Sequence, residues 1–316
     1  MPRAILGRMS LVVDRLTKRF GSVVALDALS FEVPRGQVFG FLGANGAGKT
    51  TTMRIALGVL RPDEGSIAWD GVRSDDLPRT TWGYLPEERG LYPRMTILDQ
   101  LVYFAGLYGV PADVAAREVR HWLARFRVPE FADRRAEELS KGNQQKVQFL
   151  AAILHDPDVL LMDEPFTGLD PVNVSLLREA FLELRDRGKT IIFSTHQMET
   201  AEAMCESVAI VDRGRVVVQG SIAELAADGK QTILVATSDN EEARRILGEH
   251  QAIHSLSPEN GHFRITLHPD VEAVAAAGDI SRRLVLGGAA IQRFEPSRVS
   301  LEQRFLEITT RLEEAA

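Results

Sequence analysis

The stretch GFLGANGAGKTT, residues 40–51, is a glycine-rich turn that ends in lysine and threonine. The apolar run that leads into it, residues 38–42, predicts a buried strand. The residues that follow predict a helix from about Lys49 to Val59. A loop between a buried strand and a helix N-terminus turns successive backbone N–H groups into one concavity, which suits an anion. The sequence therefore predicts an α/β unit with an anion-binding loop.

The residue types of this loop fit a triphosphate and a divalent cation. Its glycines permit tight turns and a close backbone approach that a Cβ would obstruct. Its lysine can reach β- and γ-phosphates, and the first threonine hydroxyl can ligate Mg²⁺, which is the pattern of a Walker A motif. The residues expected to hold the phosphates and the ion are Gly43, Asn45, Gly46, Gly48, Lys49, Thr50 and Thr51.

Composition limits the class of protein. The chain of 316 residues is long enough for about two domains, and its 45% hydrophobic residues can build their cores. A net charge of -7 gives no overall basic surface for nucleic acid. Cys205 is the only cysteine, so no intramolecular disulfide can form and a reducing compartment is expected. No segment has the apolar length of a membrane span; residues 147–154 are among the longest apolar runs.

Strand and helix patterns alternate along the chain. Residues 10–42 and 61–85 are typical of short strands. From about residue 98 to 154, apolar residues recur three and four apart, which predicts a helical insert. Strands and helices then alternate from about 158 to 220, which predicts a parallel sheet with crossover helices.

A second, smaller domain is predicted after the segment AADGK at 226–230. The patterns that follow are strand, helix, two strands, helix and strand, which is the ferredoxin-like order of an α+β domain. A closing helix is expected from Ser300, whose hydroxyl can cap it. We therefore place the two domains at residues 1–228 and 229–316.

Polar side chains end two further apolar strands. VLLMDEPF, residues 159–166, ends in Asp163 and Glu164, and the carboxyl ends of strands are where an α/β sheet presents ligand-binding groups. Asp163 can hold Mg²⁺ through water, and Glu164 can accept a proton from water that attacks a γ-phosphate. His196 follows the strand IIFSTH and can hydrogen-bond the γ-phosphate or the attacking water.

A second anion site is predicted in ELSKGNQQKVQFLAAIL, residues 138–154. Ser140, Gly142 and Asn143 precede a helix that we expect to begin near Gln144. A hydroxyl, backbone N–H groups and a helix N-terminus therefore come together again. One chain thus carries two surfaces suited to phosphate.

These motifs, in this order, resemble the ATP-binding subunit of an ABC transporter. The resemblance also rests on TGLD at 167–170 and STH at 194–196, and it covers residues 10 to about 225. It implies a P-loop ATPase core with an antiparallel β subdomain and a helical subdomain over about residues 92–155. It also implies that two such domains sandwich two ATP molecules with Mg²⁺. Each ATP then lies between the Walker A motif of one chain and the signature loop of the other.

The resemblance assigns further roles. The signature loop, with Ser140, Gly142 and Asn143, would contact the partner's ATP. Phe20, in KRFG, matches the aromatic that stacks on adenine, although stacking is generic and the residue could be an ordinary strand aromatic. Asp170 matches the residue that links the two ATP sites across the dimer.

Two positions depart from the family pattern. The signature LSKGN stands where LSGGQ is common, and both changed side chains remain hydrogen-bond donors. A ligand of Mg²⁺ and the γ-phosphate is commonly glutamine, whereas this chain has Glu87 at that position. The carboxylate of Glu87 can still serve as a ligand of Mg²⁺, but it is negatively charged where a glutamine amide is neutral.

The resemblance implies an ATP-hydrolysing subunit of an export complex. The C-terminal domain, mainly through residues 296–309, resembles the accessory domain of ABC ATPases of bacterial sodium and drug exporters. We expect a homodimer or a pair with a related ATPase subunit. Separate integral membrane permease subunits would dock on residues from about Tyr92 to Val128. The chain would then be cytoplasmic and peripheral on the inner face of the cell membrane.

Two other classes of protein are alternatives. A soluble ABC ATPase that acts on nucleic acid is disfavoured, because the sequence has no long coiled-coil insert, second cassette or basic stripe. No nucleic acid partner is therefore expected. A P-loop kinase would leave the second anion loop without a role.

Overall fold

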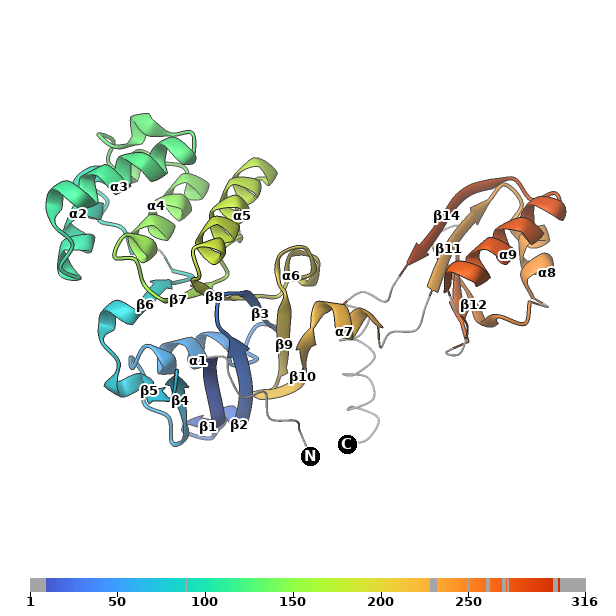
Figure 1. Ribbon diagram of the computed structural model, residues 1–316, viewed down its shortest axis with the longest axis horizontal. Helices are drawn as coiled ribbons and strands as arrows, with labels where there is room; N and C mark the ends of the chain where they lie inside the picture. The colour runs from blue at the N-terminus through green and yellow to red at the C-terminus, as the bar shows by residue number, and fades with distance from the viewer. Residues whose placement is uncertain are drawn as a thin grey trace. The chain divides into compact units, whose positions relative to one another are not determined.

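The computed structural model describes residues 10–88, 90–227, 232–248, 250–259, 262–268, 271, 273–297 and 301 (Figure 1). The chain divides into two compact units, Met1–Ile222 and Ala223–Ala316. The domain boundary expected at 228/229 falls among residues outside the described ranges and stays a prediction. The closing helix expected from Ser300 also lies outside them, except for Leu301.

The first unit contains a six-stranded sheet in the order β10-β9-β3-β8-β7-β6. Neighbouring strands from β9 to β6 are parallel, and the edge strand β10 is antiparallel to β9. The central strands are buried along their whole length, which explains their uninterrupted apolar runs. The strands are β3 (Val38–Leu42), β6 (Trp82–Leu85), β7 (Val159–Asp163), β8 (Thr190–Thr195), β9 (Ser207–Asp212) and β10 (Arg215–Ser221).

A second sheet of this unit is antiparallel, in the order β2-β1-β4-β5. The strands are β1 (Ser10–Phe20), β2 (Val23–Pro34), β4 (Glu64–Trp69) and β5 (Val72–Arg73). The prediction of several short strands over residues 10–42 is wrong, because β1 and β2 are long. Register shifts at residues 13–19 and a positive φ of 45° at Arg15 interrupt the alternation of buried and exposed side chains within continuous strands.

Helix α1 (Lys49–Ala56) lies between the two sheets, and its residues Met53 and Ile55 belong to the core cluster that both sheets form. It ends three residues before the predicted Val59, because Gly58 takes a φ of 66° and donates its N–H to the carbonyl of Ile55. α5 (Pro171–Asp186) contacts β3 and β8, and α6 (Met198–Met204) contacts β3. α7 (Ile222–Ala227) follows β10.

Three helices form the predicted helical insert: α2 (Ile97–Leu107), α3 (Ala112–Arg125) and α4 (Lys141–Ile153). Figure 1 shows them grouped together in the first unit. The predicted start of α4 near Gln144 is wrong by three residues. Ser140 caps the helix by accepting the N–H of Asn143, so the signature residues after Ser140 form the first turn. Short 3-10 turns occupy Ser74–Asp76, Arg79–Thr81, Pro129–Phe131 and Ala136–Glu138.

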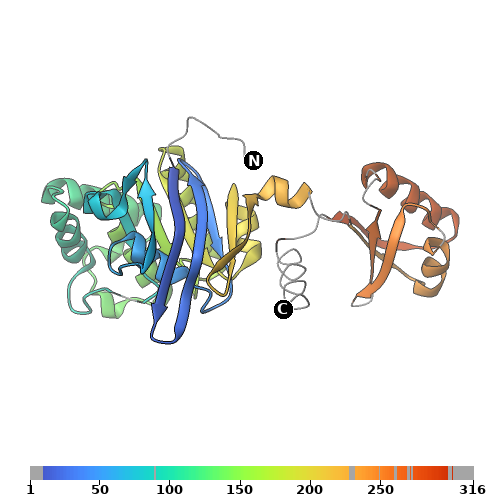
Figure 2. The same ribbon diagram turned by 90° about the horizontal axis from the view of Figure 1, so that it is seen from below.

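The second unit has the predicted ferredoxin-like order. Its sheet is antiparallel, with the strands ordered β12-β13-β11-β14. Figure 2 shows both helices on one face of this sheet, where Ile233 and Val235 pack with Ile280 and Leu284. The elements are β11 (Thr232–Thr237), α8 (Asn240–Leu247), β12 (Ile253–Glu259), β13 (His262–Leu267), α9 (Ala273–Leu286) and β14 (Ile291–Ser297).

Candidate active site

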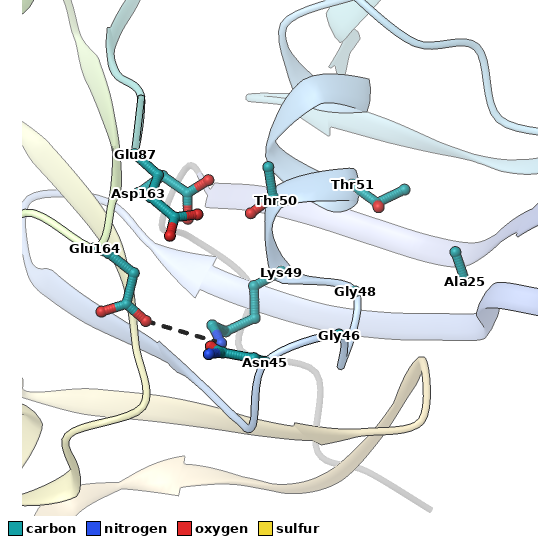
Figure 3. A pocket seen from close by; sticks show the side chains of 10 residues that line it. All are labelled: Ala25, Asn45, Gly46, Gly48, Lys49, Thr50, Thr51, Glu87, Asp163 and Glu164. Atoms are coloured by element: carbon teal, nitrogen blue, oxygen red, sulfur yellow. Dashed lines mark ion pairs between the residues drawn. The ribbon is translucent and has the colours of Figure 1, made fainter. Parts of the chain in front are cut away.

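A pocket of about 360 Å³ opens at the carboxyl ends of β3 and β7 (Figure 3). One wall is the glycine-rich loop with the first turn of α1, and the facing wall carries three carboxylates. The parallel sheet therefore brings together segments that are more than 100 residues apart in sequence. The lining residues are Ala25, Asn45, Gly46, Gly48, Lys49, Thr50, Thr51, Glu87, Asp163 and Glu164.

The backbone of the loop requires glycine at two positions. Gly43 has a φ of 155°, and a Cβ on it would lie 2.3 Å from the carbonyl oxygen of Val211. Gly48 has a φ of 106°, and a Cβ there would lie 2.8 Å from the carbonyl oxygen of Ala25. These close approaches keep the loop tight, so its N–H groups face one concavity.

The Lys49 ammonium is buried inside the loop. Its Nζ donates to the carbonyl oxygens of Gly43 at 2.7 Å and Ala44 at 3.1 Å, and it lies 4.0 Å from Oε1 of Glu164. Burial lowers the pKa of Lys49, while the carboxylates of Glu164, Asp163 and Glu87 act in the opposite direction. An anion in the pocket would further favour the charged lysine.

The Asp163 carboxylate is 1% exposed, and only one of its two oxygens has a hydrogen-bond partner among the described residues. Its Oδ1 accepts the Ser194 hydroxyl, whereas its Oδ2 has no hydrogen-bond partner among the described residues. A buried carboxylate oxygen without a donor is costly unless a cation or water meets it. Figure 3 places Asp163 and Glu87 opposite Thr50.

These oxygen ligands fit Mg²⁺, a hard cation that is usually held by one or two carboxylates together with substrate phosphates. Within the described residues there is no group of three or more His, Cys, Asp or Glu that could hold a metal ion alone. The predicted ligands Thr50, Glu87 and Asp163 therefore fit an ion that arrives with a phosphate.

Glu164 is buried and held from several sides. Its backbone has a φ of 48°, which is rare outside glycine, and its N–H donates to the Ser194 hydroxyl at 3.0 Å. Oε1 accepts Nδ1 of His196 at 2.9 Å, and Oε2 accepts the Thr167 hydroxyl at 3.2 Å. Because a carboxylate only accepts, the His196 proton lies on Nδ1. A carboxylate fixed in this way beside an anion pocket can act as a general base.

The adenine-stacking prediction places Phe20 near the pocket, but Phe20 is not among its lining residues. It lies at the end of β1, is 48% exposed, and has the Lys18 ammonium 5.5 Å from its ring centroid. Ala25, on the paired strand β2, lines the pocket instead, and sequence reasoning missed it. An alanine in a strand carries no sequence signal for this role, because its contact with the loop depends on how β2 packs over Gly48.

The signature residues lie elsewhere on the same unit. Ser140, Gly142 and Asn143 form the cap and first turn of α4, and none of them lines the pocket of its own chain. Asp170 caps α5 by accepting the N–H of Asn173 at 3.0 Å, and this bond lowers the pKa of Asp170. A Cβ on Gly142 would lie 3.7 Å from Nδ2 of Asn173, so the N-termini of α4 and α5 are neighbours.

Comparisons with known proteins give one consistent family. A family model described as ABC transporter matches residues 26–167. The uncharacterized ABC transporter ATP-binding protein YhaQ of Bacillus subtilis (strain 168) is 43% identical over 301 residues, which cover 94% of this chain and 97% of that protein. Nod factor export ATP-binding protein I of Paraburkholderia xenovorans (strain LB400) is 39% identical over 217 residues, which cover 68% of this chain and 71% of that protein. A solved structure of an ATP-binding subunit of an ABC transporter has a TM-score of 0.63 at 32% identity and covers 76% of this chain and 93% of that chain.

Proposed function

This chain belongs to the family of ABC transporter ATP-binding subunits, which are ATPases, and from that premise we propose that it energises export through separate membrane subunits. The observation that carries the proposal is the convergence of Lys49, Asp163 and Glu164 on one pocket. A relative named for Nod factor export supports the direction of transport. In the part of the chain that the structure describes, no helix is long and apolar enough to cross a membrane.

ATP binding relies on the loop and its lysine. The N–H groups around Gly46 and Gly48 surround the phosphates, and the Lys49 ammonium leaves the loop carbonyls to meet the β- and γ-phosphates. Thr50, Asp163 and Glu87 would hold Mg²⁺. When bound, the ion neutralises charge that develops on the phosphate oxygens.

Hydrolysis relies on Glu164 and His196. The Glu164 carboxylate takes a proton from the water that attacks the γ-phosphate. The Nδ1–H of His196 holds that carboxylate in place, and its Nε2 would accept a hydrogen bond from the attacking water. His196 thus orients the base and contacts the substrate.

Two copies, or this chain and a related ATPase subunit, complete each ATP site. The helix N-terminus at Ser140, Gly142 and Asn143 is an anion-binding surface that the chain's own pocket does not use. We assign it to the partner's ATP, with Asp170 at the junction of the two sites. Phe20 is exposed and can stack on the adenine.

The membrane partner docks on an aromatic cluster of the helical insert. Tyr92, Tyr103 and Phe104 contact one another with ring centroids 5.7 to 6.5 Å apart. Tyr92 and Tyr103 are 48% and 50% exposed, and aromatic residues are enriched at protein interfaces. Docking there places the chain at the inner face of the cell membrane. The second unit is then an accessory domain.

The alternative function, an ATPase that acts on nucleic acid, has no support. The relatives given above are named for transport, and the net charge of -7 gives no overall basic surface.

Replacing the pocket lysine tests the proposed chemistry. Lys49→Ala removes the charge that faces the β- and γ-phosphates, so ATP binding should weaken and Mg²⁺-dependent hydrolysis should fall by about 100-fold or more. Lys189→Ala is the matched control, because that lysine is also mostly buried but pairs with Asp156 away from the pocket. Steady-state phosphate release measures the rate of hydrolysis by each of the two variants. Near-normal turnover by Lys49→Ala would refute the assignment.

A further inference from the structure

A second pocket of the first unit, of about 550 Å³, lies beside the C-terminal end of α1. It shares no lining residue with the nucleotide pocket, and the proposed function gives it no role. Its walls are the segment from the end of α1 to the start of β4, the end of β5, and the 3-10 turns Ser74–Asp76 and Arg79–Thr81. We call it the arginine pocket, because Arg61, Arg73 and Arg79 line it.

The lining of the arginine pocket suits a small and highly charged ligand. Six of its nine lining residues are charged, and the other three are two glycines and a proline. Among the described residues, no aromatic or large apolar side chain lines it, so it offers little to the apolar body of an ordinary organic ligand. The charged residues are Arg61, Asp63, Glu64, Arg73, Asp75 and Arg79.

Two of the three carboxylates in this lining already have cationic partners. Asp63 accepts the backbone N–H of Arg19 at 2.6 Å and Nζ of Lys18 at 3.0 Å, and these bonds lower the pKa of Asp63. Asp75 lies 3.7 Å from Nη2 of Arg73. Glu64 is therefore the one carboxylate of the lining that has no partner among the described residues.

Two of the guanidinium groups keep an uncompensated charge. Arg61 forms no hydrogen bond or ion pair with another described residue. Arg79 donates from Nη1 to the carbonyl oxygen of Leu57, the C-cap of α1, and a carbonyl carries no net charge. Gly58 leaves room for this contact, since a Cβ on it would lie 3.1 Å from that Nη1. Two free positive charges thus face one free negative charge, in a chain of net charge -7.

We propose that the arginine pocket binds a phosphate monoester or diphosphate group, held by Arg61 and Arg79. A guanidinium presents two parallel N–H groups that match two phosphate oxygens, which makes arginine the side chain best suited to this anion. The same group occurs in soluble phosphate compounds and in the headgroup of phosphatidic acid. The site is separate from the nucleotide loop, so it stands whether or not the proposed function holds.

Chemical modification of arginine reads this site separately from the nucleotide pocket. Phenylglyoxal reacts with exposed arginines, and mass spectrometry of peptides from the full chain gives the rate at each position. At constant ionic strength set with sodium chloride, saturating inorganic pyrophosphate should slow the modification of Arg61 by about five-fold or more. Arg94, which is exposed and lies outside the pocket, is the internal control and should react at an unchanged rate.

Vesicles distinguish the two sources of the phosphate group. Vesicles of phosphatidic acid in phosphatidylcholine present the monoester at a membrane surface, and vesicles of phosphatidylcholine alone are their control. Protection of Arg61 by pyrophosphate supports a soluble ligand, and protection by the phosphatidic acid vesicles alone supports a lipid headgroup. If neither probe protects Arg61, or if Arg61 and Arg94 are protected equally, the proposal is overturned.

Two variants should change the affinity in opposite directions. Arg61→Gln removes a cation that no described residue needs, so the probe concentration that half-protects Arg73 should rise by about ten-fold. Glu64→Gln removes a like charge and should lower that concentration by about three-fold. Arg94→Gln is the matched control. The probe is pyrophosphate, or phosphatidic acid vesicles if only these protect. An unchanged value in Arg61→Gln, or weaker binding in Glu64→Gln, would overturn the proposal.

Discussion

Four buried polar atoms lack a hydrogen-bond partner among the described residues, and one of them, Asp163 Oδ2, belongs to a residue that lines the candidate nucleotide pocket. They are Asp70 Oδ1, Gln148 Oε1, His155 Nδ1 and Asp163 Oδ2. Asp163 faces the pocket, where an ion would satisfy it, and Gln148 holds the Glu88 carbonyl. At Asp163, therefore, the fold accepts a buried oxygen without a partner at a place where a bound ion can compensate.

The unpartnered Nδ1 of His155 predicts a pH dependence of stability. The ring of His155 stacks on Tyr108 with centroids 3.9 Å apart, and its Nε2–H donates to the Trp82 carbonyl oxygen. Protonation would add a proton to the unpartnered Nδ1. Burial accordingly lowers the pKa of His155 below 6.5, although the Trp82 carbonyl and Asp156 act in the opposite direction.

Because the folded pKa lies below the unfolded one, His155 stabilises the fold fully above pH 6.5 and loses this contribution as pH falls through the lowered pKa. Between pH 7.5 and 5.5, the free energy of unfolding should fall more steeply for wild type than for His155→Gln. One proton allows a difference of at most about 1.4 kcal/mol per pH unit, and less for a partly exposed ring. Urea unfolding of both proteins and of the exposed control His121→Gln measures it. Equal slopes for wild type and His155→Gln would contradict the prediction.

At the scale of elements, the sequence was a good guide where an apolar strand ends in a polar motif. β3, β7 and β8 were predicted because buried parallel strands are continuous apolar runs. The ends of helices were predicted less well, because they depend on caps. Ser140 starts α4 before Gln144, and Gly58 ends α1 before Val59. The lengths of β1 and β2 were not predicted, because a bulge interrupts the alternation of buried and exposed side chains by which a strand is recognised in the sequence.

The helical insert yields a prediction about its partner. Cysteines in place of Tyr92 and Leu107, which are 48% and 65% exposed, should cross-link to an integral membrane protein in native membranes. The reason is that an exposed aromatic and apolar surface suits an interface. A cysteine in place of His121, an exposed residue of α3, is the control. Mass spectrometry identifies the product. Cross-links that reach only nucleic-acid-binding proteins would contradict the docking assignment.

For the whole molecule, the candidate site was predictable because of its topology. The carboxyl ends of parallel strands meet at one edge of a sheet, so motifs after β3 and β7 had to converge. The sequence could not predict Ala25, or that Phe20 lies outside the pocket lining, because both depend on how the antiparallel sheet packs over the loop. The order of strands and helices along the second unit was predictable from the alternation of apolar patterns, and the structure has that order.

The central claim is that Glu164 is the base in an ATP site that two chains share. Glu164→Gln keeps the shape but cannot take the proton, so hydrolysis should fall by about 100-fold or more while ATP still binds. The direct measurement is the sedimentation mass of Glu164→Gln with and without ATP and Mg²⁺. The account predicts single copies without nucleotide, stable pairs with it, and no pairing when Lys49→Ala is added. Single copies at saturating ATP, together with hydrolysis at the wild-type rate, would contradict it.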